Sequence, residues 1–256
     1  MKVRVSAEEF QTFIAAISNV FRGGASLKIY KDYIECVVAA EDSASIVACA
    51  RIHILNEEEI NLGAGEEYII NVPDLSKFNK LLAMNDKDTF EFEIKGNYVY
   101  FKSDRVHGAK FVLDEIPPQK IDRRYNSKWF ASFTNRYVTE LSKKQMKDLL
   151  QVSSFADASD KIYFYQSEGN LIAECNDRTL DNIDNISIVL STDGIGTIED
   201  KIIISTDTLS RLILTTPSIN FAVVKIGNAK VTYEALLITI EHQGVYVKYF
   251  LNTKKQ

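Results

Sequence analysis

The chain has 256 residues, of which 46% are hydrophobic and 25% are charged, and its formal net charge at pH 7 is −5. These fractions are typical of a globular protein, and no apolar run is long enough to span a bilayer. The negative net charge argues against a generally basic coat for nucleic acid, so any DNA contact would require a local basic face.

The amino-terminal segment Met1–Val5 begins directly with an alternating strand pattern and lacks the apolar core of a signal peptide, which predicts a cytosolic location. The three cysteines lie in apolar, strand-like contexts, which predicts buried reduced thiols rather than a disulfide framework. The histidines show no metal-ligand spacing, so we expect no metal and no cofactor. These residues are Cys36, Cys49, Cys175, His53, His107 and His242.

Four amphipathic helices are predicted, each preceded by a β-like stretch and a capping residue. The caps are Ser6, Asp74, Ser142 and Ser205. Apolar residues follow each cap at the fourth, seventh and eighth positions, which places them on one helical stripe. These residues are Phe10, Phe13, Ile14, Phe78, Leu81, Leu82, Met146, Leu149, Leu150, Leu209, Leu212 and Ile213. Because the caps recur every 63 to 68 residues, the unit is a small subdomain rather than a stacking repeat.

Strands with period-2 patterns follow these helices. In the first half they cover Leu27–Val38, Ile46–Ile54, Phe90–Ile94, Tyr98–Phe101 and Phe111–Leu113. In the second half they cover Lys161–Tyr165, Leu171–Glu174, Ile186–Leu190, Phe221–Lys225, Lys230–Tyr233, Leu236–Glu241 and Val245–Leu251. Equivalent turn positions hold Gly96-Asn97 and Gly227-Asn228, and Gly108 and Gly244 open the last strand of each half. The pattern predicts a duplicated domain, each copy itself duplicated.

An exposed connector is predicted between the halves, over Asp114–Tyr125. It contains Pro117 and Pro118, which cannot donate to a sheet ladder. Trp129 and Phe130 follow it, and we expect them to anchor the second domain. The predicted boundaries are an amino-terminal domain over 1–116, a connector over 117–134 and a carboxy-terminal domain over 135–256.

This organisation resembles the DNA polymerase sliding clamp family, with proliferating cell nuclear antigen and the two-domain clamps of tailed phages nearest in layout. Three stretches carry the resemblance: a strand, acidic-Ser turn and returning strand over Tyr33–Val47, the aromatic end Tyr249-Phe250-Leu251, and the connector. The resemblance implies an α+β DNA-clamp fold, in which two similar domains each contain two β-α-β-β-β units. It also implies antiparallel sheets on the outside and helices lining the inner face of a ring.

The function implied by the resemblance is that of a processivity factor. Three two-domain protomers would close as a homotrimer around duplex DNA, without sequence preference, and tether DNA polymerase for replication. A clamp loader is a further implied partner, whereas a membrane is not. The mechanism is topological and requires no enzymatic step. The phage-like layout suggests a viral protein that acts in the cytoplasm of a bacterial host.

Basic residues on the helices are the candidate DNA-facing positions. At 100° per residue, three of the lysines on the third helix fall mostly opposite its apolar stripe, so that they could meet phosphates. An ordinary solvated helix face is the alternative for any one of them. The first helix departs from this pattern, because Glu8 and Glu9 occupy its exposed side. The candidates are Lys77, Lys80, Lys143, Lys144, Lys147 and Arg211.

The resemblance also implies a pocket beneath the connector for a short apolar-aromatic peptide from polymerases and other clients. Its candidate lining residues are Ala40, Ile116, Pro117, Ile121, Phe250 and Leu251. Ile116 and Ile121 could instead pin the connector onto its own domains. Protomer contact would pair the strand Ala109–Leu113 of one chain with a strand near Ile183–Val189 of another, because both have the pattern of edge strands.

Three alternatives remain open. An enzyme is disfavoured, because Gly194-Ile195-Gly196 lacks the third glycine of a dinucleotide fingerprint, and Asp157 and Asp160 are too sparse for a calcium loop. A structural or assembly protein could reuse the duplicated fold, and acidic helix faces would favour that role. A clamp could also serve mainly transcription or repair clients.

Overall fold

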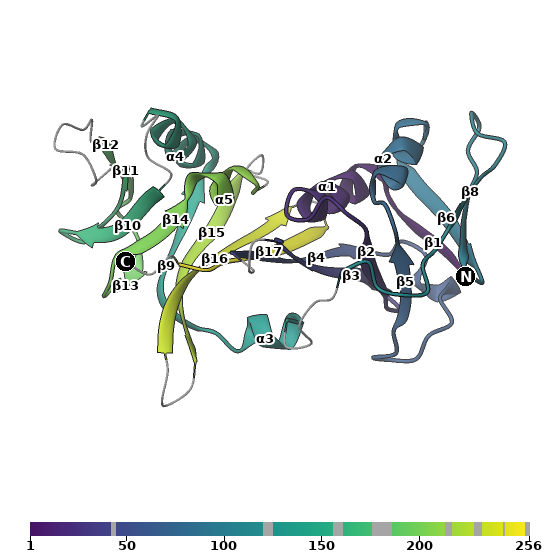
Figure 1. Cartoon of the computed structure of the whole chain (residues 1–256), viewed down its shortest axis with the longest axis horizontal. Helices are drawn as coiled ribbons and strands as arrows, with labels where there is room; N and C mark the ends of the chain where they lie inside the picture. Colours follow the sequence, from purple (N-terminus) through teal and green to yellow (C-terminus); the bar gives the residue numbers. More distant parts are fainter. Residues whose placement is uncertain are drawn as a thin grey trace. The chain divides into compact units, whose positions relative to one another are not determined.

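A computed structural model describes residues 1–41, 45–119, 125–155, 161–175, 186–212, 217–227, 232–242 and 244–253 (Figure 1). The chain divides into two compact units. Unit 1 contains Met1–Glu41, Ala48–Asn126 and Glu241–Val247, and unit 2 contains Asp42–Val47, Ser127–Ile240 and Lys248–Gln256. Each unit is α+β and combines antiparallel sheets with helices.

The elements of the first half follow the predicted order of strand, helix and three strands, made twice. The first set is β1 (Lys2–Ser6), α1 (Ala7–Ser18), β2 (Ala25–Ile29), β3 (Tyr33–Ala39) and β4 (Ile46–His53). After the short helix η1 (Glu57–Glu59), the second set is β5 (Tyr68–Val72), α2 (Ser76–Ala83), β6 (Thr89–Lys95), β7 (Tyr98–Phe101) and β8 (Ala109–Val112).

The second half repeats this order after a short helix, α3 (Ser127–Ala131). Its first set is β9 (Thr134–Ser142), α4 (Lys143–Phe155), β10 (Lys161–Ser167), β11 (Asn170–Cys175) and β12 (Ile186–Ser191). After β13 (Ile195–Gly196), its second set is β14 (Ile202–Ser205), α5 (Thr206–Ser210), β15 (Ser218–Gly227), β16 (Thr232–His242) and β17 (Val245–Leu251).

Each set exchanges its first strand with the neighbouring set. In unit 1 the strand orders are β1-β6-β7-β8 and β4-β3-β2-β5, so β1 pairs with β6 and β5 pairs with β2, and each extends the three strands of the other set. The same exchange occurs in unit 2, where the orders are β12-β11-β10-β14 and β13-β9-β15-β16-β17. The duplication predicted from the sequence is therefore a feature of the sheets as well as of the helices.

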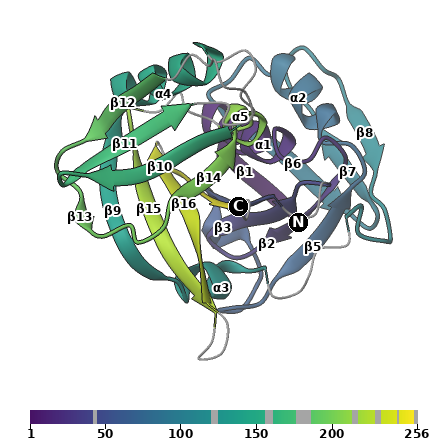
Figure 2. The ribbon, with the colours of Figure 1, turned by 60° about the vertical axis from the view of Figure 1, so that its left-hand side comes forward.

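An aromatic core joins the helices of unit 1 to one face of the sheet β1-β6-β7-β8. The Phe10 ring of α1 stacks on Phe90 at 5.3 Å between centroids, and the Phe78 ring of α2 meets Phe92 edge-on at 5.5 Å. Both helices also contact each other (Figure 2). In unit 2, α4 packs on β9, β11 and β12 and contacts α5. In unit 1, α1 and α2 thus cover one face of the sheet β1-β6-β7-β8 and leave its opposite face uncovered.

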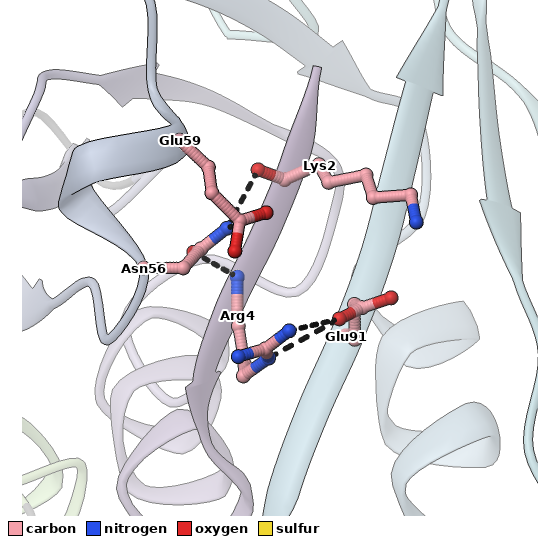
Figure 3. Close-up of polar contacts among 5 residues, drawn as sticks. All are labelled: Lys2, Arg4, Asn56, Glu59 and Glu91. Carbon is pink, nitrogen blue, oxygen red and sulfur yellow. Dashed lines mark hydrogen bonds and ion pairs between the residues drawn. The ribbon is translucent and has the colours of Figure 1, made fainter.

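The outer edge of β1 is closed by a buried asparagine (Figure 3). The Asn56 side-chain oxygen accepts from the Arg4 backbone N–H at 2.8 Å, and its amide donates to the Lys2 carbonyl at 3.2 Å. The Leu55 N–H donates to the Arg4 carbonyl at 2.8 Å, and the Arg4 side chain pairs with Glu91 on β6 at 2.9 Å. This edge strand is therefore covered by hydrogen bonds from the segment after β4.

The predicted caps are found at the helix starts. Ser6 and Ser205 are N-caps whose side chains accept from Glu9 and Thr208 N–H, and Ser142 accepts from the Gln145 N–H. Asp74 lies two residues before α2 and accepts from the Ser76 N–H at 2.8 Å. The fourth helix is shorter than the pattern predicts, because α5 ends at Ser210. Leu212 remains buried beyond the helix, and Ile213 lies outside the described residues.

Two strand predictions differ from the structure. The segment Leu27–Val38 forms two strands, because the chain turns where the Tyr30 N–H donates to the Tyr33 carbonyl at 2.9 Å. The predicted strands Lys230–Tyr233 and Leu236–Glu241 form one strand, β16, over the residues described there. In the turn Gly96-Asn97, Gly96 has φ +57°, as the two-residue hairpin requires, whereas Asn228 lies outside the described residues.

Candidate functional site

The candidate DNA-facing lysines of α4 lie on the exposed side of that helix. Lys143, Lys144 and Lys147 are exposed, whereas Met146 and Leu149 are each only 1% exposed. The helix start is fixed by a reciprocal capping arrangement, because the Ser142 N–H also donates to the Gln145 side-chain oxygen at 2.7 Å. The three exposed lysines therefore lie in the first turn and a half of α4, whose start is fixed by hydrogen bonds.

The basic residues of α2 have different environments. Lys80 is exposed, whereas Lys77 is half-buried and its ammonium lies 5.9 Å from the centre of the Phe111 ring on β8. An ammonium over an aromatic face is held by the ring quadrupole. Lys80 is therefore the freer of the two for contact with a phosphate, and Lys77 contributes its charge from a fixed position.

The remaining candidate, Arg211, has an ion-pair partner within the protein. It follows α5 directly, and its guanidinium lies 2.6 Å from the Asp207 carboxylate one turn earlier. The pair reduces the net positive charge that this helix can offer. The charge available on the helices of the described residues is consequently concentrated on α4 and α2.

The acidic first helix has a structural reason. Glu8 and Glu9 lie in the first turn of α1, where unpaired N–H groups and the helix dipole favour negative charge. Glu8 is exposed, and burial raises the pKa of the half-buried Glu9. The exposed carboxylate of Glu8 therefore suits the helix start, whereas burial opposes the charge of Glu9, and the sequence pattern of an acid shortly after a serine cap could have indicated the role of Glu8.

The connector is attached to unit 1 at two points. The Asp114 N–H donates to the Asn71 carbonyl at 2.9 Å, which adds a single bridge to β5. The Gln119 side chain accepts from the Ala39 N–H at 3.1 Å and donates to the Ala39 carbonyl. Between these points Ile116 is 77% exposed and Pro117 is exposed, whereas Ala40, beside Ala39, is buried.

The aromatic end of the chain is packed inside unit 2. The Phe250 ring lies 5.1 Å from Trp129 and 5.7 Å from Phe133, and Phe250 and Leu251 are 3% and 0% exposed. The aromatic anchor predicted at Trp129 and Phe130 is present, since Phe130 is buried in the same cluster. Among the candidate pocket residues, Ile116 and Pro117 are therefore exposed, whereas Ala40, Phe250 and Leu251 are buried. Ile121 lies outside the described residues.

Two strands at sheet edges expose apolar side chains. β8 ends the order β1-β6-β7-β8 and β12 ends the order β12-β11-β10-β14, which confirms the predicted edge position of both segments over the residues described. Val112 on β8 is 51% exposed and Val189 on β12 is 55% exposed. Unpaired backbone groups beside exposed valines suit pairing with another strand.

The glycine pair at 194–196 serves packing. Gly196 has φ +106°, and a side chain there would meet the Arg136 carbonyl oxygen at 2.0 Å, because β13 pairs with β9.

Cys36, Cys49 and Cys175 are buried thiols outside any disulfide. Within the described ranges no group of three metal-ligating side chains occurs and no helix could cross a membrane. Asp157 and Asp160 lie outside those ranges.

Comparison with known proteins relates the chain to clamp structures. No protein-family model and no curated protein sequence matches it. Among solved structures, A. fulgidus PCNA bound to the C-terminal region of FEN-1 is similar over 100% of this chain and 98% of that chain, with a TM-score of 0.72 and 15% identity. The PCNA2-PCNA3 complex of Sulfolobus tokodaii is similar over 99% of both chains, with a TM-score of 0.69 and 16% identity.

PCNA from Thermococcus kodakaraensis is similar over 99% of both chains, with a TM-score of 0.70 and 16% identity. These likenesses span the complete chain and agree with the exchanged β-α-β-β-β sets described above. The chain therefore has the DNA-clamp fold of the PCNA type, as its pattern of caps, strands and connector predicts.

Proposed function

We propose that this chain is a sliding clamp that encircles duplex DNA and tethers a DNA polymerase. The observation that carries the proposal is the likeness to PCNA structures over 99 to 100% of the chain, because it includes both units and all four helix positions. The role is mechanical: a closed ring stays on DNA by enclosing it and needs no catalytic group.

The proposed DNA contact is the exposed side of α4 together with Lys80 of α2. Lysines there would neutralise phosphates and release counterions, so binding would be independent of sequence and sensitive to salt. The Arg211–Asp207 pair and the acidic start of α1 reduce the positive charge on the other two helices. In this proposal α4 supplies most of the attraction to the duplex.

Ring closure would join β8 of one copy to β12 of the next. Both strands are sheet edges with exposed valines, and an antiparallel or parallel ladder between them would satisfy their free backbone groups. Three copies of 29.0 kDa would give an assembly of about 87 kDa. The proposed setting is the cytoplasm, which for a phage-encoded chain is that of the bacterial host, and a clamp loader would open the ring.

The proposed client site is the exposed connector segment at Ile116 and Pro117. An exposed isoleucine between two attachment points, at Asp114 and Gln119, offers an apolar contact for a client peptide. A. fulgidus PCNA binds the C-terminal region of FEN-1. By likeness, we propose that clients of this chain also present a short terminal segment.

The decisive experiment separates enclosure from ordinary binding. The chain is loaded onto a nicked circular plasmid and onto the same plasmid after linearisation, and the protein retained after a high-salt wash is measured. A sliding clamp stays on the circle and runs off the linear DNA. Equal retention on both forms, or a monomer mass by light scattering at micromolar concentration, contradicts the proposal.

The DNA face is tested by the triple substitution Lys143→Glu, Lys144→Glu and Lys147→Glu. Processive synthesis with the cognate polymerase is expected to fall by at least about tenfold, because three counterion-releasing contacts are lost and three repulsive charges are added. The matched control changes Lys31, Arg105 and Lys128 to Glu, which alters the net charge equally at exposed positions outside α4. Equal losses in both variants would remove α4 from the site.

A further inference from the structure

The solvent face of the sheet β1-β6-β7-β8 carries a row of polar and aromatic side chains. Strand register places Lys2 opposite Glu93, Glu93 opposite Tyr100, and Tyr100 opposite Lys110. Directly opposed residues of antiparallel strands point to the same face. Because Phe90 and Phe92 point to the helices from the same strand β6, this row lies on the face that α1 and α2 do not cover.

The row borders a concavity of about 500 Å³. Its cationic lining comes from Lys2, Lys102 and Lys110, all of which are exposed, with exposed His107 beside them. Its acidic lining comes from Glu91 and Glu93. The volume is that of a site for a small ligand or for one unit of a longer chain.

Both carboxylates of the concavity are already neutralised by cations of the same sheet. Glu91 pairs with Arg4 at 2.9 Å, and Glu93 pairs with Lys95 at 2.7 Å. The hydrogen bond from Lys95 lowers the pKa of Glu93, so this pair stays ionised at neutral pH. The lysines of the concavity therefore give it an excess of positive charge, although the whole chain is acidic.

Aromatic rings accompany these cations. Tyr98 and Tyr100 are half-buried neighbours on β7 with centroids 6.2 Å apart. The Lys110 ammonium lies 3.6 Å from the centre of the Tyr98 ring, and this contact holds the cation above the sheet rather than extended into solvent. Tyr100 lines the concavity itself. Lysines interleaved with tyrosines on a sheet combine phosphate attraction with a surface for base stacking.

We propose that this face binds single-stranded nucleic acid, with phosphates at Lys2, Lys102 and Lys110 and a base against Tyr100. The site is separate from the proposed duplex contact, because it lies on the face of the sheet opposite α1 and α2 and contains none of the α4 lysines. A single strand leaving a primer-template junction is a ligand of this chemistry, and a free nucleotide shares its phosphate and base.

Fluorescence anisotropy of a labelled short oligothymidylate tests the site with the full chain. The variant with Lys2→Gln, Lys102→Gln and Lys110→Gln is expected to bind the single strand more than about tenfold more weakly. The slope of the logarithm of the binding constant against the logarithm of the salt concentration should become less steep by about 2, since each phosphate contact on a single strand contributes about 0.7. Tyr100→Leu should weaken binding, whereas Tyr100→Phe should preserve it, because stacking requires the ring and not the hydroxyl group.

The matched control replaces Lys143, Lys144 and Lys147 by Gln, which should weaken duplex binding and leave the single strand unaffected. Light scattering and circular dichroism of each variant exclude a change of assembly or folding as the cause. Competition by thymidine monophosphate at micromolar concentration would assign the concavity to a free nucleotide and overturn the single-strand assignment. Wild-type affinity and salt slope in the Lys2, Lys102 and Lys110 variant would overturn the site, whatever the result for duplex DNA.

Discussion

The Asn56 side-chain oxygen accepts a hydrogen bond from the backbone N–H of Arg4 at 2.8 Å, and Asn56 is only 6% exposed. The Asn56 side-chain amide also donates a hydrogen bond to the Lys2 carbonyl. Together these two hydrogen bonds satisfy backbone groups of β1 on the side that does not pair with β6. The Asn56 side chain and the Leu55 backbone N–H together thus substitute for a neighbouring strand.

Replacement of Asn56 by alanine should therefore destabilise the chain by about 2 kcal/mol, because it leaves the part-buried Arg4 N–H and Lys2 carbonyl of β1 without their partner. Urea unfolding followed by circular dichroism measures the change. Asn61→Ala, at an exposed position before β5, is the control and should change stability little. A loss as small as that of the control would show that water replaces the Asn56 amide.

A second prediction concerns the ion pair between Arg51 and Glu35. Glu35 is 2% exposed, and the Arg51 guanidinium donates to it through Nε and lies 2.7 Å away through Nη2. Arg51→Met should cost about 3 kcal/mol, since it leaves a buried carboxylate without its cation.

The comparison for Arg51 is Lys87→Met, which removes an exposed pair with Asp104 at 3.3 Å. Exposed ion pairs contribute little to stability, so this loss should be much smaller. If both substitutions had the same effect in thermal unfolding, the buried carboxylate of Glu35 would have to be hydrated or protonated in the variant.

The start of α2 should make stability depend on pH. Hydrogen bonds from the Ser76 side chain and backbone N–H lower the pKa of Asp74 below its ordinary value. A depressed carboxyl pKa stabilises the fold above the pKa of the unfolded residue, about 4, and this stabilisation is lost as the pH falls through the folded pKa. The stability difference between the wild type and Asp74→Asn should therefore be largest near pH 6 and shrink toward pH 2.

Unfolding of both proteins across this pH range measures the effect at Asp74. Asp86→Asn, at an exposed carboxyl after α2, provides a control for general acid destabilisation. A difference between wild type and Asp74→Asn that stays constant with pH would contradict the role of the ionised carboxylate.

The proposed contact between copies predicts an effect of charge at the sheet edges. Val112→Lys or Val189→Lys places an ammonium at an exposed edge valine and should shift the solution mass from about 87 kDa toward 29.0 kDa. Leu55→Lys, at a 46% exposed position that is not on β8 or β12, should leave the assembly intact. Light scattering at several concentrations measures the solution mass of each variant. An unchanged mass in both edge variants would show that β8 and β12 do not form the contact between copies.

The sequence predicts the repeated order of elements well because its signals are local. A serine followed by apolar residues at fixed spacing defines the starts of α1 and α4, and Gly96-Asn97 defines a hairpin. The partner of a strand is not a local property. A period-2 pattern identifies β1 as a strand, but nothing in it indicates that its neighbour is β6 rather than β2.

The candidate site is less predictable for the same reason. Phe250 belongs to an aromatic strand end, but its burial depends on Trp129 and Phe133, more than a hundred residues earlier. Arg211 is different, because its partner Asp207 lies four residues before it, in the helix that Arg211 follows, and that spacing could have predicted the ion pair. Lys110 reaches the Tyr98 ring only through the register of β7 and β8.

The exchange of first strands has a consequence for how such a protein can diversify. If one β-α-β-β-β block were removed by recombination, its neighbour would keep a sheet with a missing strand and would carry a strand with no sheet to join. Loss or gain of material should thus be tolerated only in pairs of blocks. A pair of consecutive blocks, from the first or the second half of the chain, is accordingly the smallest piece expected to express as an autonomous, cooperative folding module.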